Sequence, residues 1–203
     1  MYSIKGELET EYTINKSRFI TSIYKVASID DVKHYLDITK KKYYDANHHT
    51  YAYVIGVKNQ ISKCSDDGEP SRTAGMPILE VIKKEDMTNI LVIVTRYFGG
   101  IKLGAGGLTR AYAKAATNGI NESIKTTLKE ICYYEIKIPY NYSKGIELYL
   151  KKNTNIVKVD YQVLISYEFY IQKSLMSDLE SDLFKLTEYQ IKPSLVKEEI
   201  IFV

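Results

Sequence analysis

The residues best placed to do chemistry lie between 95 and 110, in the run Thr-Arg-Tyr-Phe-Gly-Gly-Ile-Lys-Leu-Gly-Ala-Gly-Gly-Leu-Thr-Arg. Glycines let a backbone approach a ligand closely, and the first amides of a helix are free donors at the positive end of its dipole. The run therefore predicts an anion site. The residues of this predicted anion site are Arg96, Gly99, Gly100, Lys102, Gly104, Gly106, Gly107 and Arg110 of the run, with Lys114 just beyond it. The alternative is a tight turn in which the glycines only let a strand and a helix pack.

Two common phosphate loops are excluded by single positions in this run. Ala105 stands where a P-loop requires lysine, and Thr109 stands where the dinucleotide fingerprint requires glycine or alanine. The sequence therefore predicts no bound cofactor, and no nucleoside triphosphate held in the usual way.

A second candidate is the acidic loop Ser-Asp-Asp-Gly-Glu-Pro-Ser-Arg-Thr-Ala-Gly at 65–75. Its carboxylates, Asp66, Asp67 and Glu69, could bind Mg²⁺ or act as a general base. Its other polar residues, Ser71, Arg72 and Thr73, are predicted to contribute to the anion site. The EF-hand spacing is not met, and Asp-Gly and Glu-Pro also form plain surface turns. No metal site is assigned.

His48 and His49 begin a predicted strand and are the third candidate. Neighbouring strand residues face opposite ways, so the two cannot bind one metal together, and only one of them can face the site. A hydrolytic triad of serine, histidine and aspartate could be assembled from these residues, but the sequence has no nucleophile-elbow motif to support it. Catalytic roles therefore stay open among His48, His49, Asp66, Asp67 and Glu69. Cys64 is interpreted as an ordinary small side chain.

The elements that position these residues follow from periodicity and turn signals. Strands are predicted at 8–14, 17–26, 49–56 and 90–94, and helices at 29–44, 77–85 and 108–125. Ser28 is expected to cap the first helix, and Pro77 to occupy the first position of the second. Residues 58–75 are predicted to form a long loop.

The last third has the order β-α-β-β-α-β, which is the ferredoxin-like arrangement. Strands are predicted at 134–140, 156–159, 161–171 and 196–202, with helices at 142–152 and 173–186. We therefore expect an α+β protein with domains at 1–130 and 131–203. The predicted strand 161–171 would expose Gln162, Leu164, Ser166, Glu168 and Tyr170. This face does not resemble the aromatic platform on which RNA-binding domains stack bases. The second domain is expected to be a docking or orienting module.

Bulk composition limits the function classes. The chain has 203 residues, of which 45% are hydrophobic and 26% charged, and no run approaches the ~20 apolar residues of a membrane span. The first residues show neither the apolar stretch nor the small-residue cleavage site of a signal peptide, so secretion is not expected. Two isolated cysteines are typical of a reducing compartment. We expect a cytoplasmic protein without membrane contact. The net charge of +3 derives from residues 1–130, which also hold all the arginines.

The two long motifs resemble the signature of the IMPACT/YigZ family. They are Ser65 to Leu79 and Val94 to Tyr112, and residues 16–19 and 46–53 match the earlier family blocks. The resemblance implies a first domain like that shared by a small-subunit ribosomal protein and domain IV of elongation factor G. It implies a ferredoxin-like second domain similar to domain V of that factor. Eukaryotic relatives are linked to control of translation initiation through a partner that activates a kinase. Arg72 departs from the family's usual glycine.

Three functional hypotheses follow. The first is a non-enzymatic RNA- or ribosome-associated protein that regulates translation and binds backbone phosphate. The second is an enzyme, such as a metal-assisted hydrolase, on a small phosphorylated or carboxylated substrate. The third is a regulator that acts by binding a protein partner in translation control. The sequence does not define the oligomeric state, and a monomer is compatible with it.

Overall fold

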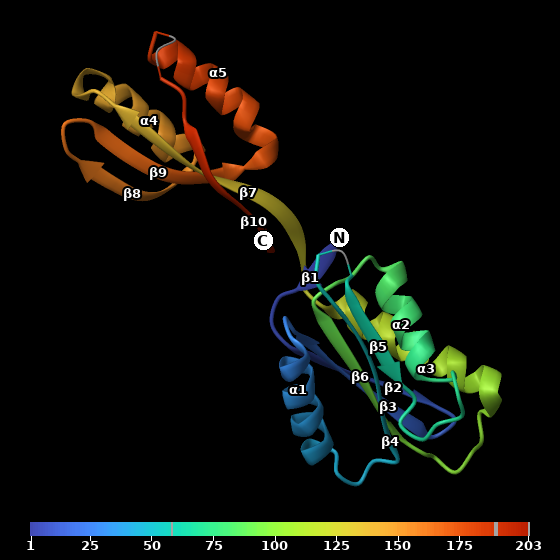
Figure 1. Ribbon diagram of the computed structural model, residues 1–203. Helices are drawn as coiled ribbons and strands as arrows, with labels where there is room; N and C mark the ends of the chain where they lie inside the picture. The colour runs from blue at the N-terminus through green and yellow to red at the C-terminus, as the bar shows by residue number, and fades with distance from the viewer. Residues whose placement is uncertain (58, 189–190, 203) are drawn as a thin grey trace. The chain divides into compact units, whose positions relative to one another are not determined.

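The computed structural model describes residues 1–57, 59–188 and 191–202. The chain forms two compact units, residues 1–127 and 128–203. Two sheets and the helices α1 to α5 give a mixed α+β architecture (Figure 1). No helix in the described part of the chain is long and apolar enough to cross a membrane.

The sheet of the first unit has the antiparallel order β2-β3-β6-β4-β5. Its strands are β2 (Leu8–Ile14), β3 (Ser17–Lys25), β4 (His48–Ile55), β5 (Ile61–Ser65) and β6 (Ile90–Tyr97). The central strand β6 is buried from Ile90 to Arg96 because both faces of the sheet are covered. The helices α2 (Gly75–Lys84) and α3 (Gly104–Glu122) pack on one face, and α1 (Ile29–Lys42) packs on the other (Figure 1).

The second unit is built around β7 (Lys125–Ile138), which pairs on one side with β9 and on the other with β10. The order in space is β10-β7-β9-β8, all antiparallel. The elements are α4 (Ser143–Asn153), β8 (Asn155–Tyr161), β9 (Ile165–Gln172), α5 (Met176–Leu186) and β10 (Ser194–Phe202). Both helices pack on the same face, which the apolar residues Ile136, Tyr167 and Phe169 occupy. The first residues of β7 also pair with β1 (Tyr2–Ile4).

Several predicted boundaries are wrong. The loop predicted at 58–75 contains β5, an edge strand whose exposed residues hide the strand pattern. Helix α2 begins at Gly75 instead of Pro77. Helix α3 ends at Glu122, and the chain from Lys125 is already strand. The strand predicted at 161–171 is divided, because the chain turns between Tyr161 and Ile165.

Candidate functional site

A buried ion pair joins the acidic loop to strand β6 in the first unit. The Glu69 side chain is 3% exposed, and its Oε1 accepts hydrogen bonds from Arg96 Nη1 at 2.7 Å and from the Tyr112 hydroxyl at 2.6 Å. Burial, and then the hydrogen bond to Glu69, raises the pKa of Tyr112 well above its ordinary value, so the phenol stays protonated and donates. The guanidinium lies 5.5 Å from the ring of Phe19 and 5.4 Å from that of Phe98. Arg96 and Glu69 therefore neutralise each other.

The two adjacent histidines of β4 have different surroundings. His48 Nδ1 lies 2.9 Å from the carbonyl oxygen of Asp67, which can only accept, so Nδ1 carries the proton. Its Nε2 is 3.9 Å from Glu69 Oε1. His49 is buried with Nδ1 at 3.2 Å from Thr95 Oγ1, and burial lowers the pKa of its ring. Of the two, His48 is the histidine that faces the Glu69 carboxylate.

The acidic loop uses its other carboxylates to hold backbone amides, Asp66 within the loop and Asp67 on β4. Asp66 accepts N–H bonds from Arg72 at 2.8 Å, Ala74 at 3.0 Å and Gly75 at 2.9 Å. Burial alone would raise the pKa of Asp66, but these three bonds bring it below its ordinary value. Asp67 Oδ2 accepts from His49 N at 2.6 Å. These oxygens therefore act as structural acceptors. Among the described residues, no three His, Cys, Asp or Glu side chains are grouped to hold a metal ion.

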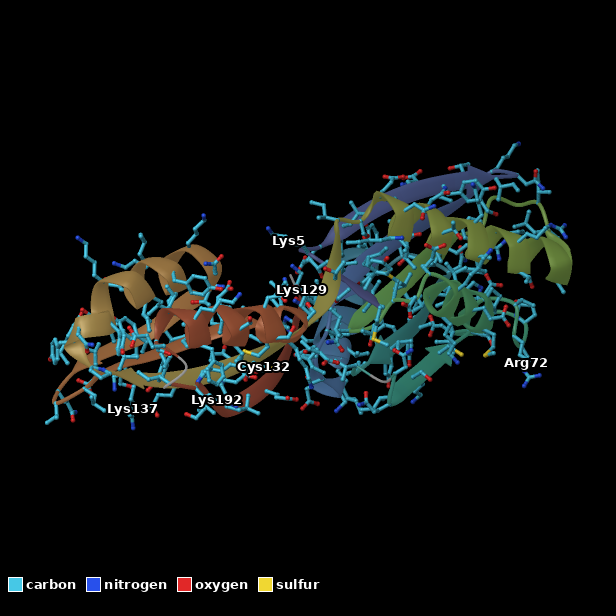
Figure 2. All side chains as sticks on the ribbon, turned by 90° about the horizontal axis from the view of Figure 1, so that it is seen from above. Lys5, Arg72, Lys129, Cys132, Lys137 and Lys192 are labelled. Atoms are coloured by element: carbon cyan, nitrogen blue, oxygen red, sulfur yellow. The ribbon has the colours of Figure 1, made fainter. Side chains whose placement is uncertain are left out.

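The remaining polar residues of this loop do not line a pocket beside the glycine-rich run. Thr73 is buried and its hydroxyl donates to the Pro70 carbonyl at 2.7 Å. Ser71 is exposed. Arg72 has a φ of 64° and its side chain extends away from the ribbon into solvent (Figure 2). Arg72 therefore adds an exposed cation near the acidic loop and does not fill a cavity.

The first amides of the glycine-rich run are already used inside the protein. Phe98 N donates to Asn47 Oδ1 at 2.8 Å, and Gly99 N donates to Ser17 Oγ at 3.1 Å. A Cβ on Gly99 would lie 2.0 Å from the carbonyl carbon of Lys16. The close approach that this glycine permits is therefore to the chain itself, at the turn between β2 and β3.

The amides after Gly99 are different. Those of residues 100–106 have no hydrogen-bond acceptor outside the helix in the part of the chain that the structure describes. Helix α3 begins at Gly104, whose φ is +70°, and no side chain caps it. The start of α3 thus retains the free donors and the positive dipole end that favour an anion.

A pocket of about 360 Å³ lies at this helix start, and we call it the α3 pocket. It is lined by Asn47, His48, Glu69, Pro70, Arg96, Phe98, Lys102, Leu103, Gly104, Ala105 and Leu108. Lys102 is exposed and forms no ion pair with any described residue. The pocket thus joins an apolar wall to the helix start, one free lysine and the His48 ring.

A second depression, of about 510 Å³, follows the side of α3, and we call it the α3 groove. It is lined by Tyr12, Ile14, Asn15, Leu103, Gly107, Arg110, Ala111 and Lys114. Leu103 belongs to both linings, so the groove and the pocket adjoin. No acidic side chain lines the groove, and neither Arg110 nor Lys114 forms an ion pair within the described residues.

The predicted anion site is therefore divided by the structure. Lys102, Gly104, Gly107, Arg110 and Lys114 lie together along the start of α3. Gly106 lies in the same turn, whereas Gly99 packs on the β2–β3 turn. Sequence reasoning missed Asn47, Ser17 and Tyr112, because each acts through a partner far away in the chain. Only the apolar helical spacing around Tyr112 indicated that it would be buried.

These features define a two-unit α+β protein whose first unit has, at a helix start, a pocket that combines an apolar wall with a few polar groups. Residues 15–120 match the family model described as the Impact N-terminal domain, so the chain belongs to the IMPACT family.

Two bacterial relatives extend the match into the second unit. The IMPACT family member YvyE of Bacillus subtilis is 38% identical over 85% of this chain and 80% of its own length. The IMPACT family member YigZ of Escherichia coli is 29% identical over 91% of this chain and 92% of its own length. A solved structure described as that of a hypothetical protein has a TM-score of 0.61 and 26% identity, and covers 97% of both chains.

Proposed function

We propose that this protein is a non-enzymatic, RNA- or ribosome-associated regulator of translation that contacts backbone phosphate along the start of α3. The supporting observation is the α3 groove, in which Arg110 and Lys114 stand without any acidic side chain in the lining. Phosphate oxygens are the natural ligands of such cations, and Arg is suited to bidentate contact.

The cations of this surface are available because each lacks a carboxylate partner. Lys102, Arg110 and Lys114 are all exposed and take part in no ion pair among the described residues. Arg96, in contrast, is buried and bound to Glu69. The proposal therefore rests on the cations of α3 and on its free amides, and Arg96 holds the pocket in shape.

The family resemblance supports the same proposal at the level of the whole chain. It implies fold analogies with a small-subunit ribosomal protein and with domains IV and V of elongation factor G, and a ferredoxin-like second unit. A ribosomal protein and an elongation factor both act in translation. A role in translation, in the cytoplasm, follows from the analogy and belongs to the proposal.

The salt dependence of RNA binding tests the proposal. Each phosphate contact releases counterions, so affinity for ribosomal RNA fragments should fall steeply as salt rises. In the variant Arg110→Gln/Lys114→Gln, the slope of log affinity against log salt is expected to be shallower by about 2, one for each lost contact. Filter-binding titrations at several salt concentrations measure the slope.

A matched control is Lys41→Gln/Lys63→Gln. It removes two exposed lysines of the same unit, from α1 and from the edge strand β5, outside the linings of the groove and the pocket. Its salt slope should stay close to that of the natural chain. Undetectable binding by the natural chain, or equal slopes for the two double variants, would contradict the proposal.

The α3 pocket favours one second candidate, an enzyme acting on a small phosphoester. His48 Nε2 faces the pocket as a proton acceptor, with its ring fixed by Asp67. In His48→Asn the side-chain amide can keep the bond to the Asp67 carbonyl but has no second ring nitrogen. If His48 transfers a proton, this variant should lower turnover by about 10²- to 10⁴-fold. A screen of phosphoesters and nucleotides, with and without Mg²⁺, measures it; an inactive natural chain rejects this candidate.

A further inference from the structure

Two tyrosines form a pair on the face of the second sheet that α4 and α5 do not cover. Tyr133 of β7 pairs directly with Tyr170 of β9, and their ring centroids are 5.4 Å apart at an interplanar angle of 46°. Side chains alternate along a strand, and the intervening residues Tyr134 and Phe169 pack with the helix-covered core. Tyr133 and Tyr170 therefore point to the opposite, uncovered face. The sequence of β9 alone indicates only Tyr170 on this face, because Tyr133 is brought beside it by the pairing with β7.

A pocket of about 270 Å³ lies beside Tyr170, and we call it the tyrosine pocket. It is lined by Lys129, Ile131, Asn155, Tyr170, Gln172 and Ile201. No acidic residue is in this lining, and Lys129 forms no ion pair with the described residues. Lys197 Nζ lies 4.2 Å from the ring centroid of Tyr133, so one face of that ring is already occupied. Tyr170 is the ring that faces the pocket.

We propose that the tyrosine pocket binds one unpaired base of single-stranded RNA, which stacks on Tyr170. Every base has a π-face, and a sheet that presents aromatic side chains is a recognised way to hold unstacked bases. The side-chain amides of Asn155 and Gln172 both donate and accept, as the edge of a base requires. Lys129 supplies a cation for the adjoining phosphate. The inference rests on the proposed function, because the ligand is again RNA.

The charge on this face indicates which end of the sheet the strand contacts. The other end has a separate pocket with the charged residues Glu135, Lys137, Lys158, Asp160 and Glu168 in its lining. Acidic residues outnumber lysines there, which disfavours a phosphate backbone. The tyrosine pocket has a lysine and no carboxylate, so the chain of phosphates is placed toward Lys129 at the start of β7.

The test uses the full chain and two fluorescent oligonucleotides of equal length, one of uridines and one with the same backbone but no bases. The natural chain is expected to bind the uridine strand more tightly in anisotropy titrations at fixed salt. Loss of one stacked base weakens binding by about 5- to 150-fold, so Tyr170→Leu should remove that preference and leave the baseless strand unaffected. Tyr170→Phe keeps the ring and should behave as the natural chain. Tyr161→Leu, at an exposed tyrosine outside the pocket, should keep the preference.

Equal binding of both oligonucleotides by the natural chain would overturn the inference, as would an equal loss for both strands in Tyr170→Leu. Arg110→Gln/Lys114→Gln, measured in parallel, separates the two proposals. It should weaken both strands and flatten the salt slope while the base preference persists. A normal slope in that variant, with the preference still lost in Tyr170→Leu, rejects the α3 groove and retains the tyrosine pocket. A flattened salt slope in that variant, with no base preference in the natural chain, rejects the tyrosine pocket and retains the α3 groove.

Discussion

Replacing Glu69 with alanine is expected to destabilise the first unit by about 3–5 kcal/mol, because it leaves the buried charge of Arg96 without a partner. Arg96 is only 5% exposed, so its guanidinium has little contact with solvent to compensate for the lost carboxylate. The Tyr112 hydroxyl loses its acceptor as well. Urea titration combined with hydrogen exchange of peptides from residues 1–127 reports this unit separately from residues 128–203.

The double variant Glu69→Leu/Arg96→Met provides the decisive comparison. It removes both charges, so it should be more stable than Glu69→Ala, although each change alone is costly. Glu80→Ala changes an exposed glutamate of α2 and should alter the unfolding free energy by no more than about 0.5 kcal/mol. A loss below about 1 kcal/mol in Glu69→Ala would show that the pair is not buried and coupled as described.

Changing Gly99 to alanine is expected to cost about 1–3 kcal/mol, and to move the segment that leads into α3. The added Cβ would lie 2.0 Å from the carbonyl carbon of Lys16 and 2.4 Å from Ser17 N, which are backbone atoms that cannot swing aside. Relief requires the run to shift, which breaks the bond from Gly99 N to Ser17 Oγ. The same denaturation measurement gives the cost, and RNA titration shows whether the shift also weakens binding.

Gly106→Ala is the matched control within the same glycine-rich run. Its Cβ would meet only the flexible end of Arg110, at 3.5 Å, and the position lies inside α3. Alanine is favoured over glycine in a helix by about 0.5–1 kcal/mol, so this variant should be slightly more stable than the natural chain. Equal costs at residues 99 and 106 would contradict the packing role given to Gly99.

Local signals predicted much of the fold. Ser28 caps α1 through a capping box with Asp31, as expected from residue type. The apolar run from Ile90 is a buried central strand, and the stripe through Leu108 and Tyr112 faces the core. These features depend on neighbours within a few residues, which is the range over which periodicity and capping act.

The errors arise where a distant residue decides the outcome. Helix α2 starts at Gly75 because the Asp66 carboxylate accepts hydrogen bonds from the amides of Ala74 and Gly75. Asp66 lies eight and nine residues before them in the chain. The preference of proline for the first helical position, which placed the predicted start at Pro77, takes no account of that contact. The apolar alternation around Tyr161 continues across the turn into β9, so one strand was predicted where the chain reverses.

The candidate site shows the same limit. Residue type and spacing predicted Arg96, Arg110 and Lys114 as cations of one site, but pairing across the fold decides which of them is free. Arg96 is held by an acid 27 residues away, whereas Arg110 and Lys114 are not held by any described carboxylate. Asp66 and Asp67 were candidates either for metal or acid–base chemistry or for a plain surface turn. In the structure Asp66 accepts an amide of its own loop and Asp67 accepts the amide of His49 on β4.

Strand β7 has a practical consequence for dissecting this protein. Its first residues pair with β1 in the first unit, and its later residues pair with β9 and β10 in the second. The pairs with β1 end at Thr127 and those with β10 begin at Leu128, so a cut between these two residues would separate the units without breaking a strand pair. A protease should find little to cut there, since cleavage favours exposed loop tips over paired backbone. Expressing residues 1–127 and 128–203 separately is therefore a direct way to assign a function to each half, beside point substitutions in the intact chain.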